Sequence, residues 1–303
     1  MRKKRVLLHL FIIVATMAIL SWLYCHNRLN NSYESYFQIK DGSVEVKEGR
    51  NNEITLLSRD NSKVKGTLIL PSKTEAPHAA VVLMGGLRTG RRAAELIPKT
   101  YLDRGIAVLS LDYHLAGHLP MPGEKARWYH YLQYPSYLFT SVENIIDAAD
   151  YLAKREDIDA NRIALVGVSF GIYFVPAAMA AQKRYSAMAI VYGGAPMGKM
   201  AEHNFTVIPA SFRPAIGTLV DLLVAPLEPT KHLSRIRERP VLYIVSTEDE
   251  QIPMECIKSV ENSIAGPKTI DYLKTRHVNP RNKKLISKLA SKAMDWLEER
   301  LLD

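Results

Sequence analysis

A serine stands between two glycines where the chain passes from a predicted strand into a predicted helix. The segment Gly167-Val168-Ser169-Phe170-Gly171 follows the apolar run Ile163–Val166. In so tight a turn the Ser169 hydroxyl is held at the helix N-terminus, where partial positive charge favours a developing alkoxide, and the flanking positions must be small. The pattern indicates a nucleophilic serine. The alternative is a glycine-rich turn in which Ser169 only caps the helix.

A serine is a poor nucleophile unless a base lies within hydrogen-bond reach and a third group orients that base. Asp249 and His277 each follow a later strand-like run, so they are the candidates for the orienting acid and for the base. Glu248 and Glu250 flank Asp249 and are its rivals. A further alternative makes all three carboxylates solvated loop residues.

The elements that must position these residues alternate along the chain. Apolar runs separated by helical patterns are typical of strands buried on both faces with helical crossovers between them, and β-like stretches near the N-terminus predict an antiparallel start. The predicted strands are Ser43–Lys47, Glu53–Leu57, Lys65–Leu70, Ala80–Met84, Ile106–Leu111, Ile163–Val166, Ala187–Tyr192, Val241–Val245 and Ile270–Leu273. The predicted helices are Arg92–Asp103, Leu138–Lys154, Gly171–Lys183, Glu255–Ile264 and Lys283–Leu302.

Several of these segments resemble a known superfamily. The turn Asp157–Ile163 before the nucleophile strand and the loop Ser246–Pro253 are similar to parts of the α/β hydrolases, especially the branch of dienelactone hydrolases and prolyl-oligopeptidase-like serine esterases. The resemblance covers residues 65–300, approximately. It implies an α/β-hydrolase fold, with a mostly parallel central sheet, antiparallel N-terminal strands and helices on both faces. It also implies the chain order nucleophile, acid, base, which the serine, aspartate and histidine above follow.

Acyl transfer also needs two preplaced N–H donors for the oxyanion. In this superfamily one donor belongs to the residue after the nucleophile, here Phe170. The other comes from the loop after the strand Ala80–Met84, where Gly86 is the first choice and Leu87 the second, because the sequence is compatible with either register. Taken alone, this loop would be a plain tight turn.

The stretch Ala195–Pro240 interrupts the alternation of strands and helices. The superfamily commonly carries a cap here, so the resemblance implies a small helical cap above Ser169. Apolar residues recur in it at helical spacing, namely Phe212, Ile216, Leu219, Val220, Leu223 and Val224. The plain alternative is that this stripe packs wholly on the domain body. We expect the insertion and Tyr113–Tyr137 to line a largely apolar site that prefers uncharged substrates.

The N-terminal segment Val6–Tyr24 has no formally charged side chain and follows four cationic residues. As a helix it spans about 28 Å, close to the ~30 Å hydrocarbon core of a bilayer. The cations predict a single-pass membrane protein whose N-terminus is cytoplasmic and whose catalytic domain is periplasmic or extracellular. The alternative is a cleaved signal peptide with a small-x-small site at Thr16–Ala18, which would make the protein secreted.

Three parts of the chain follow from this reading: a cytoplasmic tip and anchor in residues 1–30, a linker in 31–42, and a hydrolase domain in 43–303 with the insertion at about 195–240. Of the 40 Lys and Arg residues, five lie in residues 1–30, which leaves 35 against 31 acidic residues in the rest. Residues 31–303 are therefore only mildly basic and contain no run of Lys and Arg. This excludes a basic surface of the kind that binds nucleic acid. The two cysteines and nine histidines lack metal-ligand spacing, so we expect no metal and no cofactor.

Together these features predict a membrane-tethered serine hydrolase that cleaves a carboxylic ester, thioester or small amide of a small molecule through an acyl-enzyme. The alternative is a non-catalytic, membrane-tethered ligand-binding protein on the same fold. A complete set of nucleophile, acid and base in the right order favours the enzyme. The sequence gives no indication of the oligomeric state.

Overall fold

The computed structural model describes residues 36–302 except 88, 98, 116–127 and 280. The predicted membrane anchor therefore lies outside the described residues. None of the helices in the described ranges combines the length and the apolar character needed to cross a membrane.

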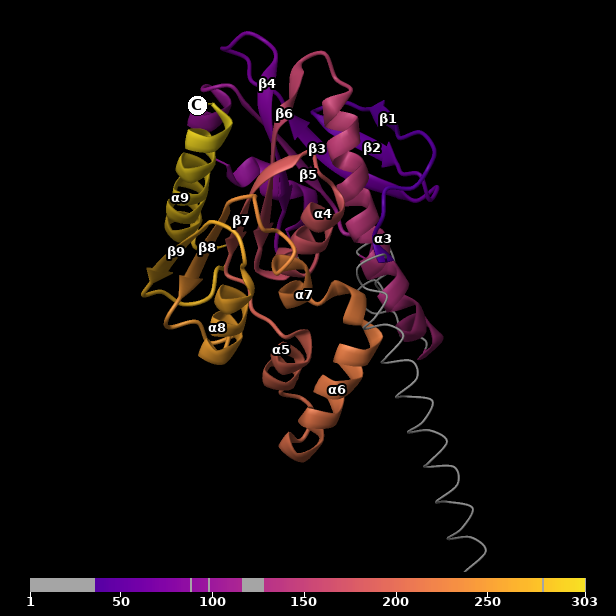
Figure 1. Ribbon diagram of the computed structural model, residues 1–303, viewed down its shortest axis with the longest axis vertical. Coiled ribbons are helices and arrows are strands. Elements are labelled where there is room, and N and C mark those ends of the chain that lie inside the picture. The colour runs from indigo at the N-terminus through magenta and orange to yellow at the C-terminus, as the bar shows by residue number, and fades with distance from the viewer. Residues whose placement is uncertain (1–35, 88, 98, 116–127, 280, 303) are drawn as a thin grey trace, which may run out of the picture.

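A nine-stranded sheet forms the centre of the molecule (Figure 1), with the strand order β1-β2-β3-β5-β4-β6-β7-β8-β9. The strands are β1 Glu45–Glu48, β2 Glu53–Leu57, β3 Lys63–Ile69, β4 His78–Met84, β5 Ile106–Leu111, β6 Ile158–Val168, β7 Tyr185–Val191, β8 Val241–Ser246 and β9 Lys268–Leu273. The pairs β1–β2, β2–β3 and β3–β5 are antiparallel, and all pairs from β5 to β9 are parallel. The predicted mostly parallel sheet with an antiparallel N-terminal part is confirmed.

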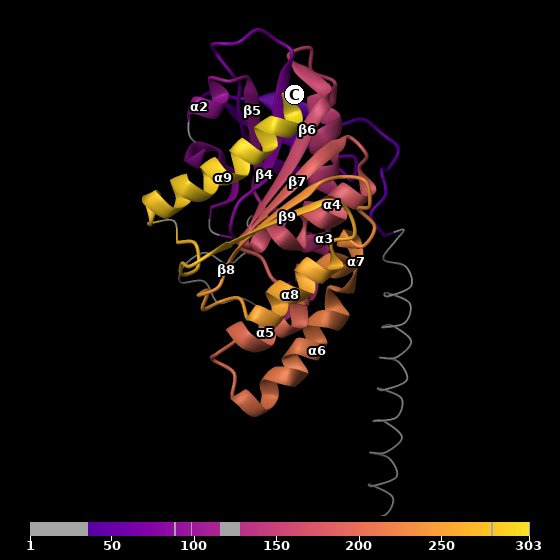
Figure 2. The same cartoon turned by 60° about the vertical axis from the view of Figure 1, so that its left-hand side comes forward.

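Helices cover both faces of this sheet (Figure 2). The α-helices are α2 Lys99–Leu102, α3 Trp128–Ala153, α4 Val175–Ala181, α5 Met197–Asn204, α6 Arg213–Leu223, α7 Pro229–Leu233, α8 Met254–Ser263 and α9 Lys283–Leu301. The 3₁₀ helices are η1 Gly90–Leu96, η3 Ser169–Tyr173, η4 Ala210–Phe212 and η5 Ala225–Leu227. One face packs against α9 and η1, and the opposite face packs against α3 and α4. Because both faces are covered, β4, β5 and β8 are buried along their whole length.

Three helices differ from the prediction, among them Gly171–Lys183, which is divided into η3 and α4. The expected helix Arg92–Asp103 consists of two short pieces, η1 and α2, because Pro98 lacks an N–H and disfavours helical geometry in the residue before it. By contrast, α3 begins at Trp128, ten residues before the expected start at Leu138, and accommodates Pro135. One proline thus divides a helix that was predicted to be continuous, and another lies inside a helix that is longer than predicted.

The insertion Ala195–Pro240 is helical, and its helices α5 and α6 lie beyond the carboxyl ends of β7 and β8 (Figures 1 and 2). The predicted apolar stripe is divided: Phe212, Leu219 and Leu223 are exposed, whereas Ile216 and Val220 are partly buried and Val224 is buried. The side of α6 that carries Gly217 packs against α5, where a Cβ added to Gly217 would come within 2.9 Å of the Gly198 carbonyl oxygen. These small residues therefore allow the close contact between α6 and α5.

A buried charged cluster fixes the turn between β2 and β3 to α3. The Arg59 guanidinium binds Asp147 and lies 2.6 Å from Asp150, and the second oxygen of Asp150 accepts from Arg184 at 2.7 Å. We call these four residues the Arg59 cluster. Its position far along α3 makes it a structural tie between the antiparallel strands and the helical layer.

Candidate active site

Ser169 follows directly on the last residue of β6 and begins η3. Its φ of 52° lies in the left-handed region, which costs a non-glycine residue on the order of 1–3 kcal/mol. The glycines on either side allow the turn to close. A Cβ added at Gly167 would come within 2.6 Å of the Val175 side chain, and one at Gly171 within 2.6 Å of the Met84 carbonyl oxygen. The backbone thus presents the serine outside the strand.

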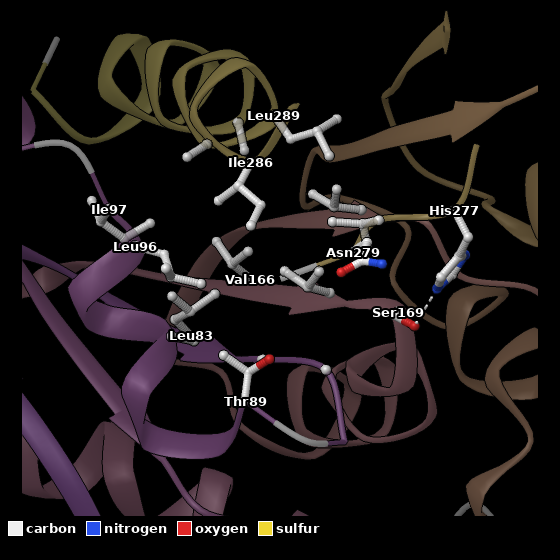
Figure 3. A pocket seen from close by; sticks show the side chains of 18 of the residues that line it. Leu83, Thr89, Leu96, Ile97, Val166, Ser169, His277, Asn279, Ile286 and Leu289 are labelled. Carbon is white, nitrogen blue, oxygen red and sulfur yellow. Dashed lines mark hydrogen bonds between the residues drawn. The ribbon is translucent and has the colours of Figure 1, made fainter. Parts of the chain in front are cut away.

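Ser169, His277 and Asp249 form one hydrogen-bonded chain. Ser169 Oγ lies 3.0 Å from His277 Nε2 (Figure 3), and His277 Nδ1 lies 2.7 Å from Asp249 Oδ2. The other oxygen of Asp249 accepts from the backbone N–H groups of Gln251 and Ile252, at 2.8 and 3.1 Å. The Asp249 side chain is fully buried, so these bonds fix it against the imidazole. This arrangement can pass the serine proton to the imidazole and stabilise the resulting charge.

The rival carboxylates of the same loop lie elsewhere. Glu248 is exposed. Glu250 accepts a hydrogen bond from the backbone N–H of His277 at 3.1 Å and approaches Arg276 Nε at 3.9 Å. Hydrogen bonds from its own backbone and from that of His277 lower the pKa of the Glu250 carboxyl. The sequence marked Glu250 only as a rival acid, and its contact with the histidine loop was missed.

Ser246, at the end of β8, joins the acid loop to the histidine loop. Its hydroxyl donates to the Thr275 carbonyl oxygen and accepts from the backbone N–H groups of Glu248 and Thr275, each at 3.2 Å. The Tyr192 hydroxyl also contacts the Thr275 side chain. The sequence showed only a small residue at this position, whereas the hydroxyl ties together the two loops that carry Asp249 and His277.

The expected oxyanion donors lie around the serine. Gly86 and Leu87 line the cavity beside Ser169. The Gly86 carbonyl accepts from the Thr89 N–H at 2.8 Å, which closes the loop as a turn. Phe170 lies in the first turn of η3, where backbone N–H groups have no partner inside the helix. Its side chain packs against Tyr113 and other aromatic rings. All three predicted donor residues are therefore next to the nucleophile, and the choice between Gly86 and Leu87 stays a prediction.

A cavity of about 580 Å³ opens beside Ser169 and extends between η1 and α9 (Figure 3). We call it the apolar cavity, after the side chains that line its far part, Leu83, Leu96, Ile97, Val166, Ile286 and Leu289. Polar groups, among them Glu250 and Asn279, gather at the end where Ser169 and His277 lie. Its volume and its mainly apolar wall with a few convergent polar groups are typical of small-molecule sites.

The expected lining of this site was wrong for the insertion, because no residue of Ala195–Pro240 lines the apolar cavity. The described side chains of Tyr113–Tyr137 do not line it either, but those of 116–132 lie outside the description, so that part stays a prediction. The described walls come from η1 and the inner face of α9. The apolar pattern of α9 fits both a core and a cavity wall, and only the distance between α9 and η1 decides between them.

In the described ranges no three His, Cys, Asp or Glu side chains converge on a possible metal site. Arg91, in η1 beside the cavity, pairs with Glu53 at 2.9 Å and with Asp112 at 3.5 Å.

The sheet topology and the serine turn define an α/β hydrolase of the serine esterase superfamily, as the resemblance predicted. Residues 100–301 match the prolyl oligopeptidase family. The chain belongs to that family.

Known proteins resemble different portions of the chain. Esterase FrsA of Yersinia pestis (strain Pestoides F) is 31% identical over 120 residues, which are 39% of this chain and 26% of the relative. The chain thus matches only about a quarter of the length of its curated relatives. Acetyl xylan esterase from Paenibacillus sp. R4 has a TM-score of 0.60 at 18% identity, covering 90% of this chain and 93% of its own. Acetyl xylan esterase 1 from Thermoanaerobacterium sp. JW/SL YS485 has a TM-score of 0.63 at 17% identity, covering 91% and 93%. At such identities these two structures show the fold alone.

Proposed function

We propose that this protein is a serine hydrolase that cleaves carboxylic esters through an acyl-enzyme. The observation that carries the proposal is the hydrogen-bonded chain from Ser169 through His277 to Asp249 at the mouth of the apolar cavity. The relatives by sequence and by fold are named as esterases, which favours esters over thioesters and small amides.

In the proposed mechanism His277 Nε2 takes the Ser169 proton as the serine oxygen attacks the ester carbonyl. Asp249 holds the ring in the tautomer that leaves Nε2 free to accept, and it stabilises the imidazolium. The backbone N–H groups of Phe170 and Gly86, or Leu87 in place of Gly86, donate to the oxyanion. His277 then gives its proton to the leaving alcohol oxygen, and water attacks the acyl-enzyme by the same route. Every step is a proton or acyl transfer, and the two protein groups that exchange the proton, Ser169 Oγ and His277 Nε2, lie 3.0 Å apart.

The apolar cavity is the place for the acyl chain. Its entrance lies at Ser169 and its far wall is formed by side chains such as Leu96, Ile97 and Leu289. Burial of apolar surface stabilises a bound chain by about 0.8 kcal/mol per methylene, so medium-chain esters gain over acetyl esters until the cavity is filled.

The direct test is a fluorophosphonate probe on the full chain, followed by a series of esters and thioesters. We expect one equivalent of label on Ser169, and neither label nor turnover in Ser169→Ala, whose melting temperature is unchanged. Labelling that persists in Ser169→Ala would remove the assignment. A correctly folded protein that neither reacts with the probe nor turns over any ester would favour the binding-protein alternative.

We also propose that the N-terminal segment tethers this enzyme to a membrane, with the catalytic domain outside the cytoplasm. The sequence of residues 1–24 supports this. Phe37 is buried and packs with Phe139 of α3 and His232 of α7, so a tether would join the body beside these helices. Alkaline phosphatase fused after Asn31 should be active in a bacterial host, and the protein should resist carbonate extraction. A mature N-terminus at Ile19 would instead make it secreted.

A further inference from the structure

A second cavity, of about 740 Å³, meets the apolar cavity at the active site. The two share Glu250, His277 and Asn279 as lining residues. The rest of its wall comes from the loop after β9 and the first turns of α9. We call it the basic cavity because four cationic residues line it, Arg276, Arg281, Lys284 and Lys288.

Most of these cations lack an acidic partner. Arg276 lies 3.9 Å from Glu250, which is the only acidic residue in the lining. Among the described residues, Arg281, Lys284 and Lys288 form no ion pair with an Asp or Glu. One turn further along α9, Lys292 is tied to Asp271 at 2.6 Å. Lys288 and Lys284, one and two turns before it, are exposed and have no such partner among the described residues.

Lys284 and Lys288 also occupy positions where a positive charge destabilises α9. Lys284 lies in the first turn of α9, next to the positive end of the helix dipole, and this turn has no acidic residue. Lys284 and Lys288 are four residues apart, so they repel each other on one face. Sequences keep locally unfavourable choices of this kind mainly where a function compensates for them. A bound anion would remove both penalties.

We propose that the basic cavity binds an anionic group, a phosphate or a carboxylate, on the alcohol part of the ester. The inference rests on the proposed function. Because His277 must protonate the leaving oxygen, the alcohol part lies against His277 while the acyl chain fills the apolar cavity. The basic cavity is the space that meets the site at His277, and its Lys and Arg side chains are the usual donors to phosphate and carboxylate oxygens. The substrate is then an apolar acyl group on an anionic alcohol, not the uncharged ester that the sequence predicts.

The test compares matched esters on the full chain at constant, low ionic strength, because salt screens exposed charges. The substrates are 1-octanoylglycerol, 1-octanoylglycerol 3-phosphate and the octanoyl ester of glycolic acid. We expect kcat/KM for the phosphate ester to exceed that for the neutral ester about tenfold, and the preference to shrink as salt is raised. In Lys284→Gln/Lys288→Gln the ratio of the two should fall to about one.

The matched control is Lys283→Gln/Lys274→Gln, which removes two exposed cations from the same helix and the same loop but outside the cavity lining. It should keep the wild-type ratio. Equal kcat/KM for the neutral ester and both anionic esters in the wild type overturns the inference, and so does an equal loss of preference in both double variants. A preference for the glycolate ester over the phosphate ester identifies a carboxylate as the anionic group. Failure of the proposed function looks different, because then no ester is cleaved and Ser169 is not labelled.

Discussion

Two buried networks of polar and charged side chains lie in this molecule, and only one of them has the features of an active site. In the Arg59 cluster the side chains of Arg59, Asp147 and Asp150 are less than a tenth exposed. In the Ser169 network His277 is 8% exposed and Asp249 is fully buried. Both networks have short, direct hydrogen bonds. Burial and bond length therefore do not distinguish a catalytic network from a structural one.

Backbone strain and access do distinguish them. Ser169 has a left-handed backbone and opens into a cavity of about 580 Å³. The hollow beside Arg59 measures about 10 Å³, too small for a substrate. Both cations of the Arg59 cluster pair with a carboxylate, whereas in the basic cavity only Arg276 has one, Glu250 at 3.9 Å. The Arg59 cluster thus has the features of a structural tie, whereas the Ser169 network opens into a cavity large enough for a small molecule.

The largest effect that tests this distinction is expected for Asp249→Asn. The amide cannot stabilise the imidazolium and favours the wrong tautomer of His277, so we expect kcat/KM to fall about 10⁴-fold with little change in melting temperature. Steady-state kinetics on an octanoyl ester, together with thermal unfolding, measures both. Glu248→Gln serves as the control and should keep wild-type activity. If it costs as much as Asp249→Asn, the acid has been assigned to the wrong residue.

Arg59→Ala should show the opposite behaviour. It leaves Asp147 and part of Asp150 buried without their cation, so we expect the free energy of unfolding to fall by about 3 kcal/mol while kcat/KM of the folded protein is kept. Denaturant unfolding measures the free energy of unfolding. Active-site titration gives the concentration of folded enzyme, from which kcat/KM of the folded protein is calculated. Lys73→Ala removes an exposed cation, paired with Asp103 at 2.8 Å, and should cost less than about 1 kcal/mol. A loss of kcat/KM in folded Arg59→Ala would erase the distinction between the two networks.

The same cluster predicts a pH dependence. Burial alone would raise the pKa of Asp150, but hydrogen bonds from Arg59 and Arg184 outweigh it and lower that pKa. A carboxyl with a lowered folded-state pKa stabilises the protein at neutral pH, and this contribution is lost as the pH falls. Burial raises the pKa of Asp147 and so offsets part of the effect. The difference in unfolding free energy between wild type and Arg59→Ala should therefore narrow below about pH 4. A difference that stays constant down to pH 3 would contradict this account.

The sequence predicted much of this architecture because the relevant signals are local. Buried parallel strands appear as continuous apolar runs, and the serine turn needs small residues at fixed positions, so the strands and Ser169 could be located from one chain. The chain order of the family then pointed to Asp249 and His277. These residues lie at strand ends, where the fold leaves little freedom of placement.

What the sequence did not reveal depends on how separate elements approach each other. Leu219 and Leu223 of α6 were expected to face the substrate, yet both are exposed, and the side of the helix that carries Gly217 packs against Gly198 of α5. The roles of Ser246 and Glu250 depend on where their side chains point across a loop. Periodicity gives the face of a helix but not the neighbour of that face, so contacts of this kind need coordinates.

Substitution of Glu250 should lower kcat, but by less than substitution of Asp249 does, and the loss should depend on the replacing side chain. The Glu250 carboxylate orients the His277 backbone but does not touch the ring, so it acts as a positioning residue. Glu250→Ala should lower kcat by about tenfold, and Glu250→Gln, which keeps a carbonyl acceptor, by about threefold. A purely structural role would lower the melting temperature of both variants without this graded rescue. Equal losses in the two variants would assign the effect to the charge of Glu250 rather than to its hydrogen bond.

The smallest effect is expected for a substitution on the outer face of α6. Two leucines of similar exposure, one on this face and one in the cavity wall, allow a direct comparison. Leu219 and Leu96 are 47% and 40% exposed, but only Leu96 lines the apolar cavity. Leu219→Asp should change the unfolding free energy by less than about 0.5 kcal/mol and leave the ratio of octanoyl to acetyl ester hydrolysis unchanged. Leu96→Asp places a carboxylate against the acyl chain, where leaving it unpaired is costly, so that ratio should fall about tenfold. Because the two side chains have the same size and nearly the same exposure, a difference between the variants reports on the cavity alone. If Leu219→Asp lowers the ratio as much as Leu96→Asp does, the insertion contacts the substrate after all and the cavity wall has been assigned to the wrong elements.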